Sequence, residues 1–442
     1  MTLKPTVVDL FCGAGGLSAG FQSAGYSIIG GLDSWGPAVS SFALNKARAR
    51  AVRGDVREID ESEFLGSLTA APDVVLGGPS CQGFSTSSGL SRSGRKKDDP
   101  RNSHFMHFIR LVNALSPGWV VMENVTGLLL FNRGDVAHKI IDEFAKIGYK
   151  VIPMILLAAD FGVPQLRRRL FFVGNRTAQP ISFPMPTNGN PDLWKNFALP
   201  FEHLSRIGNK SSAGAVAPHV SIADAISDLP IVKPGEQFDE APYPGRPESA
   251  FQRRMRRYSR RLSLHVAAQL SAFDATAIPH IGEGQNWTAL PENVKSGRFS
   301  RIRSYDATTL MKRPKWDGPS YTITTKTNDA TAGPFIHPRQ DRTLTLREAA
   351  RLQSFPDNYK FFGTHSEIRK QIGNAVPPLL GERIARAILP EVLEYSGLST
   401  SQKSPPRLTF DPVTDVHELI GLKKPRKRQD GQGLLFAGCE ES

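Results

Sequence analysis

Short β-branched runs alternate with stretches of helical periodicity from the start of the chain to about residue 180, and no other feature constrains the fold as strongly. This alternation is typical of a parallel β-sheet whose strands are connected by covering helices. Crossover helices are predicted over 101–115 and 135–147, where helical stretches end at glycine or proline. Strands are predicted at residues 6–10, 27–32, 73–76, 119–122, 151–158 and 170–173. The sequence therefore predicts an α/β fold.

The regular pattern stops after residue 183 and returns near residue 339 of the 442-residue chain. The intervening residues are irregular and rich in proline and glycine, with short strand candidates such as 321–325. Helices are predicted again over 345–353 and 378–393. We therefore predict one domain made of residues 1–183 and 339–395, a second domain inserted at 184–338, and a flexible basic tail at 396–442.

The chain is strongly basic, with a formal net charge of +13 and an isoelectric point near 9.7. Such a surface attracts polyanions through electrostatic steering and counterion release, so nucleic acid is the leading candidate partner. A basic enzyme whose charge serves only solubility is the alternative that composition leaves open.

Hydrophobic residues make up 40% of the chain, as in ordinary soluble enzymes, and no uncharged apolar run reaches the roughly 18 residues that a membrane span needs. Cys12, Cys81 and Cys439 are too few and too scattered for a disulfide framework. No cysteine or histidine spacing is typical of a metal site. We expect a cytoplasmic protein that needs no metal and no membrane.

The segment DLFCGAGGLSAGF, residues 9–21, reads as a strand that runs through a glycine turn into a helix. Gly13, Gly15 and Gly16 would let a ligand approach the backbone, and the helix start offers free N–H groups. Asp33, after the next strand, could accept hydrogen bonds from ribose hydroxyls, and Asp55 could hold an adenine amino group. For either aspartate alone, a capping or surface role is equally compatible.

The segment GGPSCQGFS, residues 77–85, follows the strand predicted at 73–76 and contains Cys81. Ligands of open α/β sheets bind at the carboxyl ends of the strands, so this thiol is predicted to face the site. A buried, inert cysteine is the favoured interpretation for Cys12 and Cys439 instead. The polar, basic stretch that follows, 85–102, has the composition of a lid that closes on a polyanion.

Two further motifs follow neighbouring strands. Glu123, in ENV, emerges from an apolar strand, and partial burial would favour its protonated form, although a structural salt bridge is the alternative. In QLRRR, side chains alternate, so Gln165, Arg167 and Arg169 share a face that could grip a base edge, the Glu123 carboxylate and a phosphate. Arg168 points the other way and is expected to face solvent.

Six segments, DLFCGAGG, GGPSCQGFS, ENV, QLRRR, RTLTLREAARLQSFPD and QIGNAVPP, occur in the order seen in the DNA (cytosine-5) methyltransferase family. The chain resembles that family over about residues 5–180 and 320–393. The resemblance implies a Rossmann-like domain that binds S-adenosyl-L-methionine, with an irregular target-recognition domain inserted before its last helix. It also implies methyl transfer to carbon 5 of a cytosine flipped out of double-stranded DNA.

The resemblance also implies roles for individual residues. Cys81 resembles the nucleophile that adds to carbon 6, Glu123 the group that protonates N3, and Arg167 and Arg169 the basic clamp on the cytosine and the catalytic loop. The residues expected to bind the cofactor are Phe11, Gly13, Ala14, Gly15, Asp33, Asp55, Val56, Pro79, Asn374 and Val376. Ser80 stands where the family usually has proline, and Asp33 stands where glutamate is commoner.

DNA contacts are expected from the lid and from the predicted helix 251–262. On that helix an apolar stripe is formed by Phe251, Met255, Tyr258 and Leu262, and the arginines face away from it. These arginines could bind phosphates, but an ordinary solvated helix face is equally compatible with the pattern. The residues assigned to DNA are Gln82, Ser85, Arg95, Lys96, Arg253, Arg256, Arg257 and Arg260. We expect a monomer on DNA, from a restriction-modification system or a solitary modification enzyme. An RNA cytosine methyltransferase and a DNA-binding regulator without activity are the rivals.

Overall fold

The computed structural model describes residues 3–79, 104–130, 134–189, 216–295, 297–300, 302, 307–398 and 406–410. Its centre is a seven-stranded sheet in the order β3-β2-β1-β4-β5-β8-β6. The strands are β1 (Thr6–Leu10), β2 (Ser27–Asp33), β3 (Arg50–Arg53), β4 (Val74–Gly77), β5 (Trp119–Asn124), β6 (Lys150–Leu157) and β8 (Arg168–Asn175). Strands β3, β2, β1, β4 and β5 pair in parallel, which confirms the predicted α/β class. The prediction is wrong for β8, which runs antiparallel to both of its neighbours because a direct connection from β6 reverses the chain.

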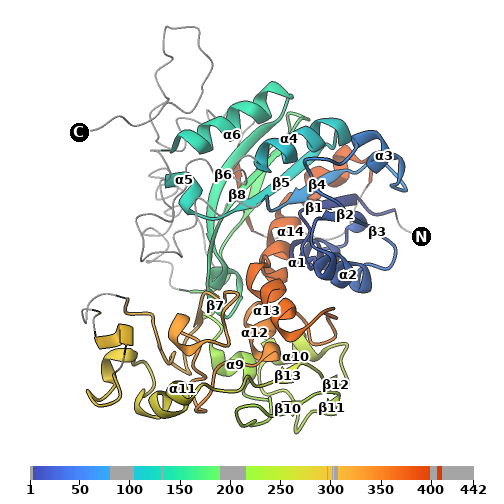
Figure 1. Cartoon of the computed structure of the whole chain (residues 1–442). Helices are drawn as coiled ribbons and strands as arrows, with labels where there is room; N and C mark the ends of the chain where they lie inside the picture. The colour runs from blue at the N-terminus through green and yellow to red at the C-terminus, as the bar shows by residue number, and fades with distance from the viewer. Residues whose placement is uncertain are drawn as a thin grey trace, which may run out of the picture.

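Helices cover both faces of this sheet, with α3, α4 and α6 on one side and α1, α2 and α14 on the other (Figure 1). Their bounds are α1 (Gly16–Ser23), α2 (Gly36–Asn45), α3 (Glu61–Gly66), α4 (His104–Leu115), α5 (Gly127–Leu130), α6 (Asp135–Lys146) and α14 (Pro378–Tyr395). Helix α14, from the far end of the chain, packs against α1 so closely that a Cβ on Gly20 would lie 2.4 Å from backbone atoms of Pro378 and Glu382. Only glycine permits that approach.

The rest of the described chain forms short elements, some of which pack on the core of the sheet and some around a second, smaller core. These are β7 (Gln165–Leu166), β9 (Ile181–Pro184), α9 (Ile222–Ile226), β10 (Gln237–Phe238), β11 (Ala241–Pro242), α10 (Ala250–Arg256), β12 (Arg261–Leu262), β13 (His265–Val266), α11 (Ala272–Ala277), β14 (Ser320–Tyr321), α12 (Leu346–Leu352), α13 (His365–Asn374) and β15 (Arg407–Phe410), with 3-10 turns η6 (Ala158–Phe161), η7 (Ile278–His280), η8 (Trp287–Ala289), η9 (Gly297–Ser300) and η10 (Ala330–Ala332). Apolar residues of α9, α10 and α12 belong to the same core as the sheet. Trp287, Phe299 and Met311 belong to the separate core, which extends from Ala277 to Ile336.

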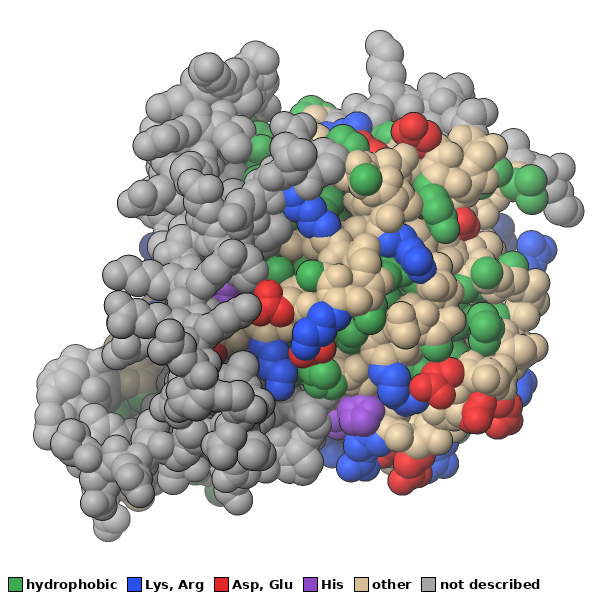
Figure 2. All heavy atoms as spheres, turned by 90° about the horizontal axis from the view of Figure 1, so that it is seen from above, with side chains coloured by type: hydrophobic (Ala, Val, Ile, Leu, Met, Phe, Trp, Pro, Cys, Tyr) green, Lys and Arg blue, Asp and Glu red, His purple; other side chains and the backbone are tan. Residues whose placement is uncertain are grey.

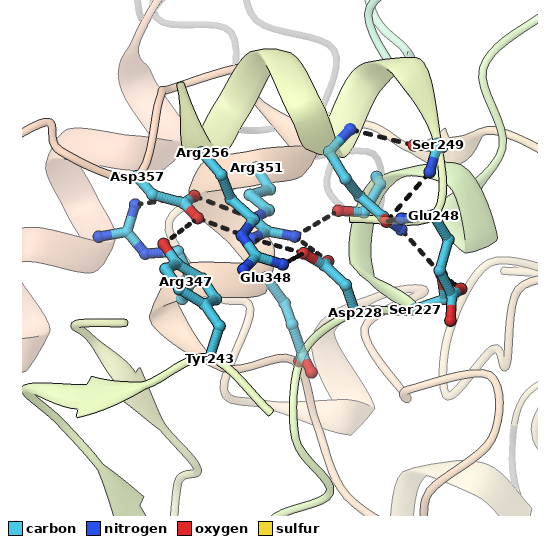
Figure 3. A network of polar contacts seen from close by, with 12 residues as sticks. Ser227, Asp228, Tyr243, Glu248, Ser249, Arg256, Arg347, Glu348, Arg351 and Asp357 are labelled. Carbon is cyan, nitrogen blue, oxygen red and sulfur yellow. Dashed lines mark hydrogen bonds and ion pairs between the residues drawn. The ribbon is translucent and has the colours of Figure 1, made fainter. Parts of the chain in front are cut away.

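A buried network of arginines and carboxylates joins α12 to the segment that carries α9 and α10 (Figure 3). Arg351 donates to Asp357 at 2.9 and 2.7 Å and also binds Asp228, while Tyr243 donates to Asp357 at 2.6 Å. Burial alone would raise the pKa of Asp357, but the arginines beside it lower that pKa to about 2. Breaking a buried pair by removing one partner leaves an uncompensated charge and costs about 3–5 kcal/mol, so this network fixes how the segments meet.

Part of the predicted flexible tail is ordered. Strand β15 pairs antiparallel with β9, and Phe183 and Phe410 meet edge to face with ring centroids 6.1 Å apart. For residues 407–410 the prediction of a free tail is wrong, because their backbone and Phe410 find partners on β9. None of the helices in the described part of the chain is both long enough and apolar enough to cross a membrane.

The face seen from above carries acidic and basic side chains close together among its described residues (Figure 2). The net positive charge of the chain is therefore not gathered into one visible patch on that face. Charge alone does not identify where a polyanion would bind on it.

Candidate active site

A cavity of about 1090 Å³ opens at the carboxyl ends of β1, β2, β4 and β5. Among the residues assigned from sequence, its walls contain Phe11, Gly13, Ala14, Asp33, Asp55, Val56, Pro79, Glu123, Arg167, Arg169, Asn374 and Val376. Gly15, also assigned to the cofactor, is not among the lining residues. Segments far apart in the sequence thus meet at one cavity, at the sheet edge where open α/β folds bind ligands.

The glycine turn after β1 has the backbone geometry that its sequence predicts. Gly13 and Gly15 have φ angles of 53° and 84°, in the region that favours glycine. A Cβ on Gly13 would meet nothing within 4 Å, so the backbone there faces open space. Gly15 instead packs against the protein. A Cβ placed on it would lie 3.0 Å from Phe42 and from the Tyr359 hydroxyl.

Two aspartates near this turn are placed differently from each other. Asp33 accepts hydrogen bonds from the backbone N–H groups of Gly13 and Trp35 at 2.8 and 2.9 Å, so it fixes the turn. Burial raises the pKa of Asp33. Asp55 is more exposed and pairs with Arg57, whose side-chain hydrogen bonds lower the pKa of that carboxyl to about 2.

Asp9, in the strand that leads into the turn, has one carboxylate oxygen without a hydrogen-bond partner among the described residues. Its side chain is buried, it lines the cavity, and no hydrogen bond reaches Oδ2 among the described residues. Burial raises the pKa of Asp9 to about 6, and burial lowers that of nearby Lys46 to about 8. A buried acceptor without a partner is costly, so this corner of the cavity suits a ligand that carries a hydrogen-bond donor or an amine.

Glu123 and Arg169 form an ion pair in the cavity wall, with 2.8 Å between Oε1 and Nε. Burial raises the pKa of Glu123 even though Arg169 and Arg167 act in the opposite direction. The direction of the pKa shift agrees with the prediction for Glu123, and the salt bridge considered as the alternative is present as well. The carboxyl is therefore more easily protonated than an exposed glutamate, as a group that delivers a proton requires.

The chain leading toward Cys81 starts beside this pair. A Cβ on Gly78 would lie 3.2 Å from Oε2 of Glu123, and Asn124 donates to the carbonyl of Pro79 at 3.2 Å. Cys81 itself lies outside the described residues, as do Gln82, Ser85, Arg95 and Lys96.

Gln165 does not have the role predicted for it, whereas Arg167 lines the cavity but is held mainly by the protein's own backbone. Arg167 is fully buried and donates to the backbone carbonyls of Ile323 at 2.8 Å and Gly373 at 3.1 Å. Gln165 is also fully buried, and both ends of its amide bind other parts of the protein. The prediction that Gln165 grips a base is wrong. Both terminal nitrogens of Arg167 bind backbone carbonyls, while its Nε has no hydrogen-bond partner among the described residues. Arg169 is the direct ion-pair partner of Glu123. Arg168 is exposed, as predicted.

The helix predicted over 251–262 is shorter than expected, because the chain leaves α10 after Arg256 and pairs Leu262 with Ala241 in β12. Tyr258 is 71% exposed, so it does not belong to an apolar stripe. Arg256 pairs with Asp228 at 3.0 Å and stacks on Tyr243, which makes its assignment to DNA wrong. Arg253, Arg257 and Arg260 are exposed.

Sequence reasoning missed one wall of the cavity. Thr322, Thr324 and Thr325 line it, next to Ile323. Residues 321–325 were predicted as a strand, but only Ser320 and Tyr321 pair, in parallel with β7. No chemical motif marks these threonines, so only their place beside Gln165 and Arg167 reveals them.

Comparison with known proteins agrees with this geometry. The family model "C-5 cytosine-specific DNA methylase" matches residues 5–390. The type II methyltransferase M.DdeI of Desulfomicrobium norvegicum is 34% identical over 400 residues, covering 86% of this chain and 88% of the relative. The type II methyltransferase M.AgeI of Thalassovita gelatinovora is 32% identical, covering 86% and 98%. A solved DNA modification methyltransferase encoded within a prophage (E. coli) shares the fold, with a TM-score of 0.65, 23% identity, and coverage of 88% of this chain and 100% of the other.

Proposed function

Because the chain belongs to the C-5 cytosine-specific DNA methylase family and is a DNA (cytosine-5-)-methyltransferase, we propose that it methylates a cytosine within a specific sequence of double-stranded DNA. The methyl donor in this proposal is S-adenosyl-L-methionine, and the attacking group is the Cys81 thiolate. The names of its relatives favour a place in a type II restriction-modification system.

One observation carries the proposal. A single cavity contains the glycine turn, the Asp33 carboxylate and the Glu123–Arg169 pair, and the sequence puts Cys81 two residues after Pro79 in its wall. A cofactor site and a proton-delivering carboxyl thus share one space, which a transfer between cofactor and base requires.

The residues fit S-adenosyl-L-methionine. The open backbone at Gly13 leaves room for close approach, and Oδ2 of Asp9, which has no partner among the described residues, can accept a hydrogen bond from the ligand. The cavity wall also contains Phe11, Asp55 and Asn374. Bound S-adenosyl-L-methionine would supply an activated methyl group for carbon 5 of the cytosine.

The chain's own groups make carbon 5 reactive. The Cys81 sulfur forms a bond to carbon 6, and the ring electrons move toward carbon 5 and N3. Glu123 donates a proton at N3, and Arg169 orients that carboxyl and stabilises it once it is ionised. Loss of the carbon 5 proton to water then releases the Cys81 thiolate, and the N3 proton returns to Glu123, which restores the neutral ring.

A stacked base cannot reach these groups, so the cytosine must be flipped out, at a cost of a few kcal/mol. Phosphate contacts would offset part of that cost. The exposed Arg253, Arg257 and Arg260 are candidates for such contacts, whereas Arg256 is not.

Replacing Arg253, Arg257 and Arg260 together by glutamine should weaken DNA binding and flatten its salt dependence. Each phosphate that a protein neutralises adds about 0.9 to the slope of log K against log salt, so three arginines that each bind one phosphate account for about 3. Fluorescence anisotropy with a duplex at several salt concentrations measures the slope. Lys4→Gln is the control, because Lys4 is exposed and distant in sequence from the three arginines. An unchanged slope in the triple variant would remove these arginines from the interface.

The proposed function itself is tested by supplying methyl-labelled S-adenosyl-L-methionine with either duplex DNA or RNA. Label should appear in DNA, at carbon 5 of cytosine, and bisulfite sequencing should then show one recurrent sequence around the modified base. Label in RNA alone would establish an RNA methyltransferase. No label in either nucleic acid would support a regulator without activity.

A further inference from the structure

Two fully buried glutamines connect the two walls of the cavity. Gln353 follows α12 directly, and Gln165 lies in β7. The amide nitrogen of Gln165 donates to Oε1 of Gln353 at 2.9 Å, and Oε1 of Gln165 accepts from the backbone N–H of Ile323 at 2.8 Å. Neither glutamine is among the residues that line the cavity. Both lie behind it.

The amide nitrogen of Gln353 points to the end of α13. It donates to the carbonyl of Ile372 at 2.7 Å and reaches that of Ala375 at 3.4 Å, while Arg167 donates to the carbonyl between them, Gly373, at 3.1 Å. The last carbonyls of a helix lack the usual partner four residues on. Here the N–H of Ala375 donates to the carbonyls of Gln371 at 3.2 Å and Ile372 at 3.3 Å, and the buried side chains add the remaining bonds. After Asn374 the backbone becomes extended, with φ −63° and ψ 148° at Ala375, so the helix lacks the left-handed turn that often supplies such partners.

The whole turn lines the cavity: Gly373, Asn374, Ala375 and Val376 all belong to its wall. The carbonyls of Gly373 and Ala375, on either side of Asn374, accept hydrogen bonds from Arg167 and Gln353. The turn also presses against the opposite wall, because a Cβ on Gly373 would lie 2.4 Å from the carbonyl carbon of Thr324. Gln165 and Arg167 hold that wall through the N–H and the carbonyl of Ile323. One buried set of side chains therefore fixes both walls.

We propose that Gln353 is a positioning residue for cofactor binding: it holds the turn 372–376 so that Asn374 and Val376 face the cofactor, without touching cofactor or DNA itself. This inference rests on the proposed function, in which the cavity binds S-adenosyl-L-methionine. If the turn loses the hydrogen bonds from Gln353, the cofactor must order the turn on binding. The free energy of that ordering appears as weaker affinity for the cofactor. The chemical step, which depends on Cys81 and Glu123, should change much less.

The test compares Gln353→Met with Gln252→Met. Gln252 is equally buried, and its amide also bonds to other parts of the chain, donating to Ser227 at 2.8 Å and accepting from Glu248 N–H at 2.6 Å. It belongs to the N-terminal capping box of α10, and it is not part of the cavity wall. A general loss of stability should therefore affect both variants, whereas a loss of cofactor positioning should affect only one.

For Gln353→Met we expect the KM and Kd for S-adenosyl-L-methionine to rise about tenfold, the effect of removing one or two buried hydrogen bonds. The kcat and the KM for DNA should change by less than about twofold, within the scatter of surface substitutions. Gln252→Met should lower the Tm comparably and leave the cofactor KM unchanged. Calorimetric titration gives the Kd without turnover.

If Gln353→Met does not fold, Gln353→Leu provides the same test, because it also removes both the acceptor for Gln165 and the donor to Ile372. Equal cofactor KM values in wild type and in a folded Gln353 variant would overturn the inference alone. Failure of the wild-type protein to bind S-adenosyl-L-methionine would instead overturn the proposed function.

Discussion

Replacing Cys81 by alanine should abolish methyl transfer, leaving less than about one ten-thousandth of the wild-type kcat, as expected when a catalytic nucleophile is removed. Carbon 5 of cytosine is too weak a nucleophile to accept a methyl group until a thiolate has added to carbon 6. Cys12 cannot replace Cys81, because burial and nearby carboxylates raise the pKa of its thiol well above the usual value. Transfer of labelled methyl to duplex DNA under single-turnover conditions measures the loss.

The covalent step can be observed directly with DNA that carries 5-fluorocytosine at the target. Fluorine at carbon 5 replaces the proton that must leave, so the protein stays bonded to the base and migrates as a conjugate on a denaturing gel. Cys81→Ala should form no conjugate, and Cys439→Ala, the control, should form it normally. A conjugate that persists without Cys81 would identify another nucleophile and refute the proposed mechanism.

Replacing Glu123 by glutamine should lower kcat by about 10²–10⁴, the range that general acid catalysis contributes. Glutamine can hydrogen-bond to N3 of the cytosine, but it cannot transfer a proton to it. The same variant should change the pH profile. Burial raises the pKa of Glu123, so the carboxyl is protonated below that raised pKa and loses its proton as pH rises through it. Wild-type kcat should therefore fall on the alkaline side, and Glu123→Gln should lack that fall.

Glu391→Gln is the matched control for Glu123. Glu391 is buried in α14 and pairs with Arg407 at 2.6 Å, yet it is not among the residues that line the cavity. Its replacement should leave kcat and the pH profile unchanged. If Glu123→Gln keeps more than about a tenth of the activity, or retains the alkaline fall, another group must deliver the proton.

Local pattern was enough to predict the framework of the sheet. The strands at 6–10, 27–32 and 119–122 match β1, β2 and β5 within one or two residues, because burial of a strand shows directly in a short apolar run. Glu123 and the glycine turn could be placed at the site for a similar reason, since the carboxyl ends of parallel strands share one edge. The direction of β8 could not be predicted, because either direction buries the same side chains.

The contacts that a side chain makes with distant segments could not be inferred from local pattern. Alternation placed Gln165, Arg167 and Arg169 on one face, but only the structure shows that Arg169 meets Glu123 while Arg167 meets carbonyls 156 and 206 residues away. Arg256 is basic in the same way as Arg253, and only packing against Asp228 and Tyr243 removes it from the surface available to DNA.

The sequence by itself determined the chemistry: which residue types stand at the strand ends, and therefore which reaction the chain can carry out. Only the tertiary structure decided which polar side chains act on a ligand and which hold the protein together. The physical reason is that a buried donor must find an acceptor, and the available acceptors are backbone carbonyls whose positions depend on how distant segments pack.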